Sequence, residues 1–309
     1  MTDNPQPIIS TSLSRAWLES LRLRTLPLAC ASVMTGSALA WWQGQLSPAT
    51  ALLALLTTAL LQILSNLAND YGDAQKGSDT PARIGPLRGM QKGAISQQQM
   101  RNALILTVAL TIISGVWLVV RASHSLNDIF GFIALGGIAI VAAIAYTVGK
   151  KPYGYLGLGD ASVLIFFGWL GVAGSNYLQT HHFPALLFLP ATACGLMAVA
   201  VLNVNNMRDI ESDRQHGKYT LAVRLGAVGA RRYHCLLLGG SLLCCALFAL
   251  LASLNPGGWL FLLATPLLFN QARHILRETS AVAMRPMLEK TVKSALLLNL
   301  LFSLGLVLN

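Results

Sequence analysis

Nine apolar runs, most of them close to 20 residues long, constrain the fold of this chain more than any other feature. An α-helix needs about 20 apolar residues to cross a hydrocarbon core of about 30 Å. Because 54% of the 309 residues are hydrophobic and only 11% are charged, the composition excludes an ordinary soluble enzyme. The runs lie near residues 26–42, 49–68, 102–120, 129–148, 161–178, 183–204, 235–254, 257–272 and 294–308. We therefore expect an all-α integral membrane protein, a bundle of nine transmembrane helices that forms one domain over residues 1–309.

The eighth run, residues 257–272, differs from the others because it is short and contains Pro266. A proline within a helix removes a backbone hydrogen bond and clashes with the preceding turn. We expect this helix to be tilted, kinked or partly interfacial.

Basic residues are distributed so unevenly between the connecting segments that they predict an orientation. With the N-terminus in the cytoplasm, every Lys and Arg except Arg121 falls on the cytoplasmic side, in agreement with the positive-inside rule. The net charge of +10 is then explained by orientation and anionic lipid, so membrane lipid is an expected partner and nucleic acid is not. Every acidic residue except Asp128 lies on the same side, which this rule does not require. The excess of cytoplasmic carboxylates indicates a functional site there.

Two clusters of acids and amides, about 140 residues apart, each end an apolar run. Residues three or four apart share one face of a helix, so each cluster forms a stripe of oxygen atoms. The stripes consist of Asn66, Asp70 and Asp73, and of Asn205, Asp209 and Asp213. Carboxylates at the end of an apolar helix are costly to desolvate, so two such clusters indicate bound cations or a polyanion. Solvation of the helix ends and local ion pairing are the alternative explanation.

The residue types of these clusters also indicate which metal they bind. Mg²⁺ prefers hard oxygen ligands and is usually held by one or two carboxylates together with phosphate oxygens of a substrate. The five cysteines and six histidines show no spacing typical of a metal site. The sequence therefore predicts Mg²⁺ as the cofactor.

Two long polar segments, about residues 70–100 and 207–232, follow the clusters and are expected to cap the site. Their basic side chains suit a diphosphate, because arginine in particular makes planar contacts with phosphate. The basic residues near the clusters are Lys76, Arg83, Arg88, Lys92, Arg208, Arg214, Lys218 and Arg224. Arg88, Lys92, Arg208 and Lys218 are the candidate diphosphate contacts. For each of them the alternative is a charge that only sets the orientation in the membrane.

A third polar segment, residues 146–160, joins the fourth and fifth apolar runs on the same side and is rich in Gly and Tyr. Tyr146, Lys150 and Tyr153 are candidates for binding an acceptor molecule. The alternative is an aromatic belt at the membrane interface with a tight turn. Asp160, at the start of the fifth run, is explained equally well by helix capping and by catalysis.

Taken together, these motifs resemble the UbiA superfamily of intramembrane prenyltransferases, whose members carry two Asp-rich motifs on nine transmembrane helices. Residues 66–79, 85–89 and 217–226 are similar to the branch of 1,4-dihydroxy-2-naphthoate polyprenyltransferases of menaquinone synthesis. The first stretch reads Asn66-x-x-x-Asp70-Tyr71-x-Asp73-x-x-x-Gly77-x-Asp79. It departs from the Asn-Asp-x-x-Asp-x-x-x-Asp form of the 4-hydroxybenzoate branch, and the third acidic ligand is either Asp73 or Asp79.

The resemblance implies a reaction at the cytoplasmic face of the inner membrane. A polyprenyl group passes from polyprenyl diphosphate to 1,4-dihydroxy-2-naphthoate, with release of diphosphate and CO₂, to give demethylmenaquinone in its reduced quinol form. The implied catalytic residues are Asp70, Asp73, Asp209 and Asp213, which hold two Mg²⁺ ions with the help of Asn66 and of either Asn205 or Asn206. Mg²⁺ and the basic side chains neutralise charge on the leaving diphosphate.

Two other functions are compatible with the sequence. A UbiA-type enzyme that uses another aromatic acceptor, such as 4-hydroxybenzoate, would carry similar motifs. A cation-coupled transporter could also contain repeated helices and membrane acids, but transporter sites usually lie near the bilayer midplane, and these acids lie at one face.

Overall fold

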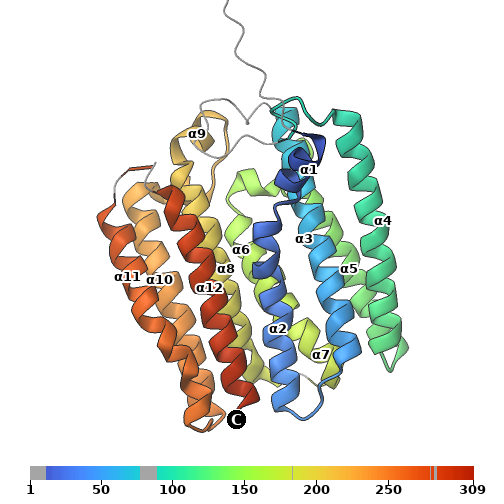
Figure 1. Cartoon of the computed structure of the whole chain (residues 1–309), viewed down its shortest axis with the longest axis vertical. Helices are drawn as coiled ribbons and strands as arrows, with labels where there is room; N and C mark the ends of the chain where they lie inside the picture. The colour runs from blue at the N-terminus through green and yellow to red at the C-terminus, as the bar shows by residue number, and fades with distance from the viewer. Residues whose placement is uncertain (1–11, 77–88, 183, 279, 282–283) are drawn as a thin grey trace, which may run out of the picture.

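The computed structural model describes residues 12–76, 89–182, 184–278, 280–281 and 284–309. All regular secondary structure in these residues is helical, and the long helices run side by side along the molecule (Figure 1). Seven helical stretches of the described chain are long and apolar enough to cross a membrane. They are α3 (Pro48–Lys76), α4 (Gln97–Ala122), α5 (Leu126–Ala145), α6–η3–α7 (Gly159–Thr180), η4–α8 (Ala185–Arg208), α10 (Leu221–Leu251) and α12 (Met284–Val307). The all-α prediction is therefore confirmed.

Two further stretches cover the remaining apolar runs. α2 (Leu26–Trp42) is apolar but has only 17 residues. The eighth run forms a 3₁₀ segment, η5 (Pro256–Ala264), which passes directly into α11 (Thr265–Arg277). Pro266 lies in the first turn of α11, where a missing N–H costs little. Because a 3₁₀-helix rises about 2.0 Å per residue and an α-helix 1.5 Å, η5 and α11 together extend roughly 37 Å.

Two short helices lie at the end of the bundle opposite the C-terminus. α1 (Leu13–Leu21) and α9 (Ile210–Gln215) both lie at this end (Figure 1). The second predicted cap segment, residues 207–232, is largely helical: it comprises the end of α8, all of α9 and the start of α10. Within α10 the helix is interrupted at Gly226, whose φ of +68° favours glycine. Residues 77–88 of the first cap segment lie outside the described part of the chain.

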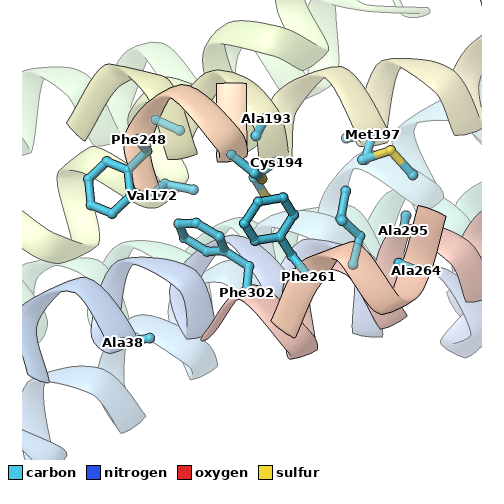
Figure 2. Close-up of a cluster of buried hydrophobic side chains, with 14 of the residues drawn as sticks. Ala38, Val172, Ala193, Cys194, Met197, Phe248, Phe261, Ala264, Ala295 and Phe302 are labelled. Carbon is cyan, nitrogen blue, oxygen red and sulfur yellow. The ribbon is translucent and has the colours of Figure 1, made fainter. Parts of the chain in front are cut away.

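The largest core cluster surrounds α8, which packs against η3 (Leu164–Gly174), α10 and α12. Phe248, Phe261 and Phe302 meet beside Cys194 in this core (Figure 2). The ring centroids of Phe248 and Phe302 are 5.7 Å apart in an edge-to-face arrangement. Lipid tails are as apolar as these side chains, so helices in a membrane associate mainly through close packing. This core fixes α8, and thereby the second acidic cluster at its end.

Small residues permit close approach of the helices deeper in the bundle and also at the first cluster. A Cβ added to Gly36 of α2 would lie 2.4 Å from the carbonyl oxygen of Val172 in η3. A Cβ added to Gly72 of α3 would lie 2.8 Å from the carbonyl oxygen of Thr147. The segment that follows α5 therefore contacts the last turns of α3 directly, at the level of the acidic residues.

Candidate functional site

A cavity of about 1300 Å³ connects the acidic helix ends with the apolar interior of the bundle. Its polar end is lined by residues from five separate parts of the chain, including Glu19, Arg22, Asn66, Asn69, Asp73, Lys92, Tyr146, Tyr153, Asn205, Arg208 and Lys218. Its deeper part is apolar and lies between α3, α5 and η3, with Phe132, Gly136 and Phe166 among the lining residues. A concave, mostly apolar space with a few polar groups is typical of a ligand site.

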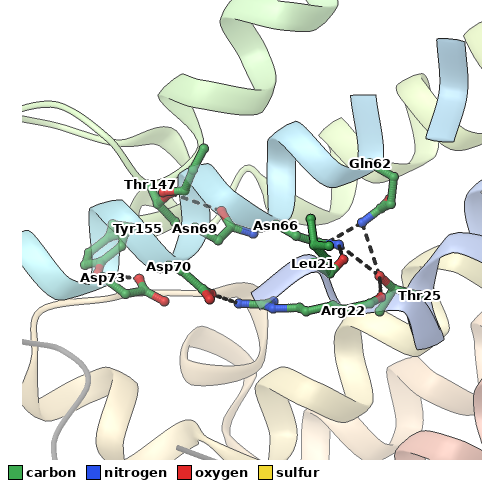
Figure 3. Close-up of polar contacts among 11 residues, drawn as sticks. Leu21, Arg22, Thr25, Gln62, Asn66, Asn69, Asp70, Asp73, Thr147 and Tyr155 are labelled. Atoms are coloured by element: carbon green, nitrogen blue, oxygen red, sulfur yellow. Dashed lines mark hydrogen bonds and ion pairs between the residues drawn. The ribbon is translucent and has the colours of Figure 1, made fainter. Parts of the chain in front are cut away.

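The first acidic cluster lies on the last turns of α3. Asn66, Asp70 and Asp73 are all buried; Asn66 and Asp73 line the cavity, whereas Asp70 is not part of its lining. An Nη of Arg22 donates to Oδ1 of Asp70 at 2.5 Å (Figure 3). The arginine follows α1 and has a left-handed φ of +49°. A buried carboxylate is thus neutralised by a cation from the segment between α1 and α2.

The side-chain amide of Asn66 binds the segment between α1 and α2 that carries Arg22. Its Nδ2 donates to the carbonyl oxygen of Leu21 at 2.9 Å and to the hydroxyl of Thr25 at 3.2 Å. Its Oδ1 accepts from Nε2 of Gln62 at 3.0 Å (Figure 3). Asn66 therefore fixes the chain that carries Arg22 against α3.

The second cluster does not form one continuous helical stripe. α8 ends at Arg208, and Asp209 has a non-helical φ of −103° before α9 begins. Nε and Nη2 of Arg208 donate to the two carboxylate oxygens of Asp209 at 2.7 and 2.6 Å. The same Nη2 donates to Oδ1 of Asn205 at 2.9 Å. Asp213, on α9, forms an ion pair of 3.4 Å with Nζ of Lys218.

Tyr155 links the two clusters. Its hydroxyl donates to Oδ1 of Asp73 at 3.2 Å (Figure 3). Nζ of Lys218 lies 5.7 Å from the centroid of its ring, and Nζ of Lys76 lies 4.9 Å from it. Although the two acidic motifs are far apart in the sequence, they reach the same aromatic side chain and the same cavity.

The candidate acceptor residues are placed differently from one another. Tyr146 and Tyr153 line the cavity and meet edge to face, with ring centroids 5.3 Å apart. Burial raises the pKa of Tyr146, and the carboxylates of Asp160, Asp73 and Asp213 raise it further. Burial also raises the pKa of Tyr153. Both phenols are therefore neutral hydrogen-bonding groups, whereas Lys150 is exposed and outside the cavity lining.

Two of the remaining residues predicted from the sequence lie at or near the cavity, and two lie outside the described part of the chain. Lys92 lines the cavity, and its Nζ lies 2.6 Å from Oε2 of Glu19 on α1. Asp160 is buried at the start of α6 (Gly159–Val163), behind the cavity lining. Asp79 and Arg88 lie outside the described residues.

Sequence reasoning missed Arg22, Gln62, Thr147 and Tyr155. In the sequence, Arg22 is one of the basic residues that predict the orientation in the membrane. The residues around it give no indication that it contacts Asp70. Thr147 and Tyr155 lie in the Gly- and Tyr-rich segment, where composition indicates a site without distinguishing its members. The hydroxyl of Thr147 donates to Oδ1 of Asn69 at 3.0 Å. Asn69 lies between Asn66 and Asp70 in the sequence, so its amide was a further sequence indication of a site at the first cluster.

The donor atoms around the cavity fit a hard cation that shares its ligands with a substrate. Within the described ranges, no three carboxylate, imidazole or thiol side chains converge into a metal centre. Asp70, Asp209 and Asp213 instead contact Arg22, Arg208 and Lys218. Mg²⁺ commonly takes only one or two protein carboxylates and completes its shell with water and phosphate oxygens. The oxygen-rich donor set at the cavity suits such a partial site.

Comparison with known proteins agrees with this geometry. The model of the UbiA prenyltransferase family matches residues 29–293. The chain is 66% identical over 298 residues to the 1,4-dihydroxy-2-naphthoate octaprenyltransferase of Escherichia coli, covering 96% of this chain and 97% of that protein. It is 54% identical over 297 residues to the protein of the same name in Haemophilus influenzae, covering 95% and 96%.

The fold also resembles a solved structure, that of a UbiA homolog from Archaeoglobus fulgidus bound to GPP and Mg²⁺. The TM-score is 0.59 at 15% sequence identity, over 93% of this chain and 99% of that one. The region that the family model matches contains both acidic clusters and extends from α2 into α12. The chain therefore belongs to the UbiA prenyltransferase family.

Proposed function

We propose that this protein transfers a polyprenyl group from polyprenyl diphosphate to 1,4-dihydroxy-2-naphthoate, with Mg²⁺ as cofactor. The observation that carries the proposal is a single cavity that is lined at one end by the buried Asp73, by amides and by cations paired with the other acids, and that has an apolar interior at the other end. A polyprenyl diphosphate likewise has a charged head at one end and an apolar tail at the other, so its two parts match the two ends of the cavity. The names of the Escherichia coli and Haemophilus influenzae relatives support 1,4-dihydroxy-2-naphthoate as the acceptor and a prenyl diphosphate as the donor. They also favour a tail of octaprenyl length.

The acidic clusters would hold Mg²⁺ at the charged end of the cavity. Asp70, Asp73, Asp209 and Asp213 are the proposed ligands, with Asn66 and Asn205 as neighbouring oxygen donors. Asp79 is an alternative to Asp73 on sequence grounds. Bound Mg²⁺ neutralises charge on the diphosphate and so favours cleavage of the allylic C–O bond. The related structure bound to GPP and Mg²⁺ supports the choice of metal.

The cations already paired with these acids are the proposed contacts for the diphosphate. Arg22, Arg208 and Lys218 each lie against a buried carboxylate and also line the cavity. When a metal takes the carboxylates, these cations are available for phosphate oxygens, so no buried charge is left unpaired. Lys92 at the cavity mouth is a further contact, and the sequence adds Arg88.

The apolar part of the cavity would hold the tail and exclude water from the allylic cation. α5 packs against α3 and α4, and only Ala139 among its residues is buried. Gly136 lines the cavity, and a Cβ placed on it meets no atom within 4 Å. From Tyr146 to Phe132 the lining follows α5 for about 21 Å, which is most of a ~30 Å hydrocarbon core.

The acceptor would bind beside Tyr146 and Tyr153, with Lys150 at the outer edge of this region. The ring carbon that bonds to the prenyl cation loses its carboxylate as CO₂, which restores the aromatic ring. No proton has to leave that carbon, so the reaction requires no general base there. The neutral phenols act as hydrogen-bonding and packing groups, in agreement with their raised pKa values.

The proposed topology places one domain of nine helices in the inner membrane. α2 and the stretch η5–α11 would supply the two spans beyond the seven long ones. The distribution of Lys and Arg supports a cytoplasmic N-terminus and a cavity mouth that faces the cytoplasm.

Replacing Asp70 or Asp209 with Asn should lower the rate of prenyl transfer at least about a hundredfold, because each change removes charge from the proposed metal site. Purified variants would be assayed by product mass with saturating Mg²⁺. Glu211→Gln is the matched control, since this carboxylate lies in the second motif but is exposed and outside the cavity lining. Near-normal turnover in both Asn variants would remove the acids from the mechanism.

The acceptor is tested by competition between two aromatic acids. With one polyprenyl diphosphate and equal concentrations of both acids, the protein should prenylate 1,4-dihydroxy-2-naphthoate and leave 4-hydroxybenzoate almost unchanged. Mass spectrometry identifies head group and tail in one measurement. Preferential use of 4-hydroxybenzoate would favour the other family branch, and solute counterflow in vesicles without a covalent product would favour a transporter.

Gly136→Phe should discriminate against long tails, because the new ring would fill the apolar part of the cavity. We expect the ratio of kcat/KM for octaprenyl over geranyl diphosphate to fall by roughly tenfold. Gly131→Phe is the control on the same helix, since Gly131 also has open space around it but does not line the cavity. An unchanged ratio in Gly136→Phe would place the tail elsewhere.

A further inference from the structure

We propose that Tyr155 is a positioning residue that couples the two acidic motifs, so that the metal and diphosphate subsites form together. The inference rests on the proposed binding of a metal diphosphate at the cavity. It concerns a side chain that touches both motifs but is not itself a proposed ligand.

The hydroxyl of Tyr155 orients the first motif. It donates to Oδ1 of Asp73 at 3.2 Å, and both residues are buried. Asp73 lines the cavity. A hydrogen bond to one carboxylate oxygen fixes the rotation of the group, and in a buried site this contact is stronger than in water. Tyr155 therefore determines how the Asp73 carboxylate is presented to the cavity.

The ring of Tyr155 orients the second motif. Nζ of Lys218 lies 5.7 Å from its centroid and 3.4 Å from Oδ1 of Asp213. Nζ of Lys76, at the end of α3, lies 4.9 Å from the same centroid. Cations are attracted to an aromatic face within about 6 Å. The ring thus contacts ammonium groups from both motifs.

The main chain of Tyr155 is tied to the second motif. Its carbonyl oxygen accepts from the backbone N–H of Tyr219 at 2.9 Å. Nη2 of Arg224 donates to the carbonyl oxygen of Leu156 at 3.0 Å. Gly157, with φ of +80°, permits this approach, because a Cβ there would lie 2.9 Å from the carbonyl oxygen of Tyr219. A displacement of the chain after α9 would therefore be transmitted to Asp73 through one side chain.

Two substitutions separate the hydroxyl from the ring. Tyr155→Phe removes the hydrogen bond to Asp73 but keeps the aromatic face, whereas Tyr155→Leu removes both. Tyr219→Phe is the matched control, because residue Tyr219 is 52% exposed and the change leaves its backbone contact intact. The full chain in detergent would be titrated with Mn²⁺ in the presence of inorganic pyrophosphate, and separately with pyrophosphate alone.

We expect Tyr155→Phe to weaken Mn²⁺ binding by about tenfold, the size of one charge-assisted hydrogen bond, while pyrophosphate alone binds as in the wild type. Tyr155→Leu should weaken both Mn²⁺ and pyrophosphate, and Tyr219→Phe should weaken neither. In turnover, Tyr155→Phe should raise the Mg²⁺ concentration for half-maximal rate and leave kcat at saturating Mg²⁺ largely unchanged. A purely structural role would not produce this split.

If Tyr155→Phe binds Mn²⁺ with the affinity of the wild type, the inference is overturned. A lower unfolding temperature of Tyr155→Leu would not change this conclusion, because it would show only that the ring stabilises the fold. Absence of Mn²⁺ binding in the wild type would overturn it together with the proposed metal site. If the wild type binds Mn²⁺ and pyrophosphate but transfers no prenyl group to any acceptor, only the proposed reaction is contradicted. The binding measurements on Tyr155→Phe and Tyr155→Leu would still decide the role of Tyr155.

Discussion

The arrangement depends on the pairing of buried carboxylates with buried or partly buried cations at the mouth of an apolar cavity. Asp70 with Arg22, Asp209 with Arg208, and Asp213 with Lys218 are three such pairs. Removing one partner of a buried pair leaves an uncompensated charge, which is far more costly than losing a pair at the surface. The pairs therefore keep acids and bases together at the end of a membrane bundle, where each alone would be unfavourable.

This constraint explains why segments distant in sequence are held so tightly around the cavity. Asn66 fixes the chain that carries Arg22, and the hydroxyl of Thr147 donates to the carbonyl oxygen of Ala68 on α3 at 3.1 Å. Glycines allow these contacts: a Cβ on Gly154 would lie 2.6 Å from the carbonyl oxygen of Tyr146. Close backbone packing at the polar end thus positions the charges, while the loosely packed α5 leaves space for an apolar ligand.

The sequence predicts the elements better than it predicts their contacts. Apolar runs reveal the long helices because crossing a membrane requires a long apolar stretch, and acids at helix ends identify α3 and α8 as carriers of the site. The helix break at Asp209 was missed, since the spacing of Asn205, Asp209 and Asp213 also fits an unbroken helix. The partnership of Arg22 with Asp70 and the bridge through Tyr155 arise from tertiary packing, which local periodicity does not encode.

In the proposed mechanism both acidic motifs act on one metal-bound diphosphate. Anomalous X-ray diffraction from crystals of the full chain with Mn²⁺ and a non-hydrolysable prenyl thiodiphosphate would locate the metal and the diphosphate together. We expect Mn²⁺ in the cavity, coordinated by carboxylates from both motifs and by oxygens of the diphosphate. Mn²⁺ bound to only one motif, or a diphosphate bound away from the cavity, would contradict the mechanism.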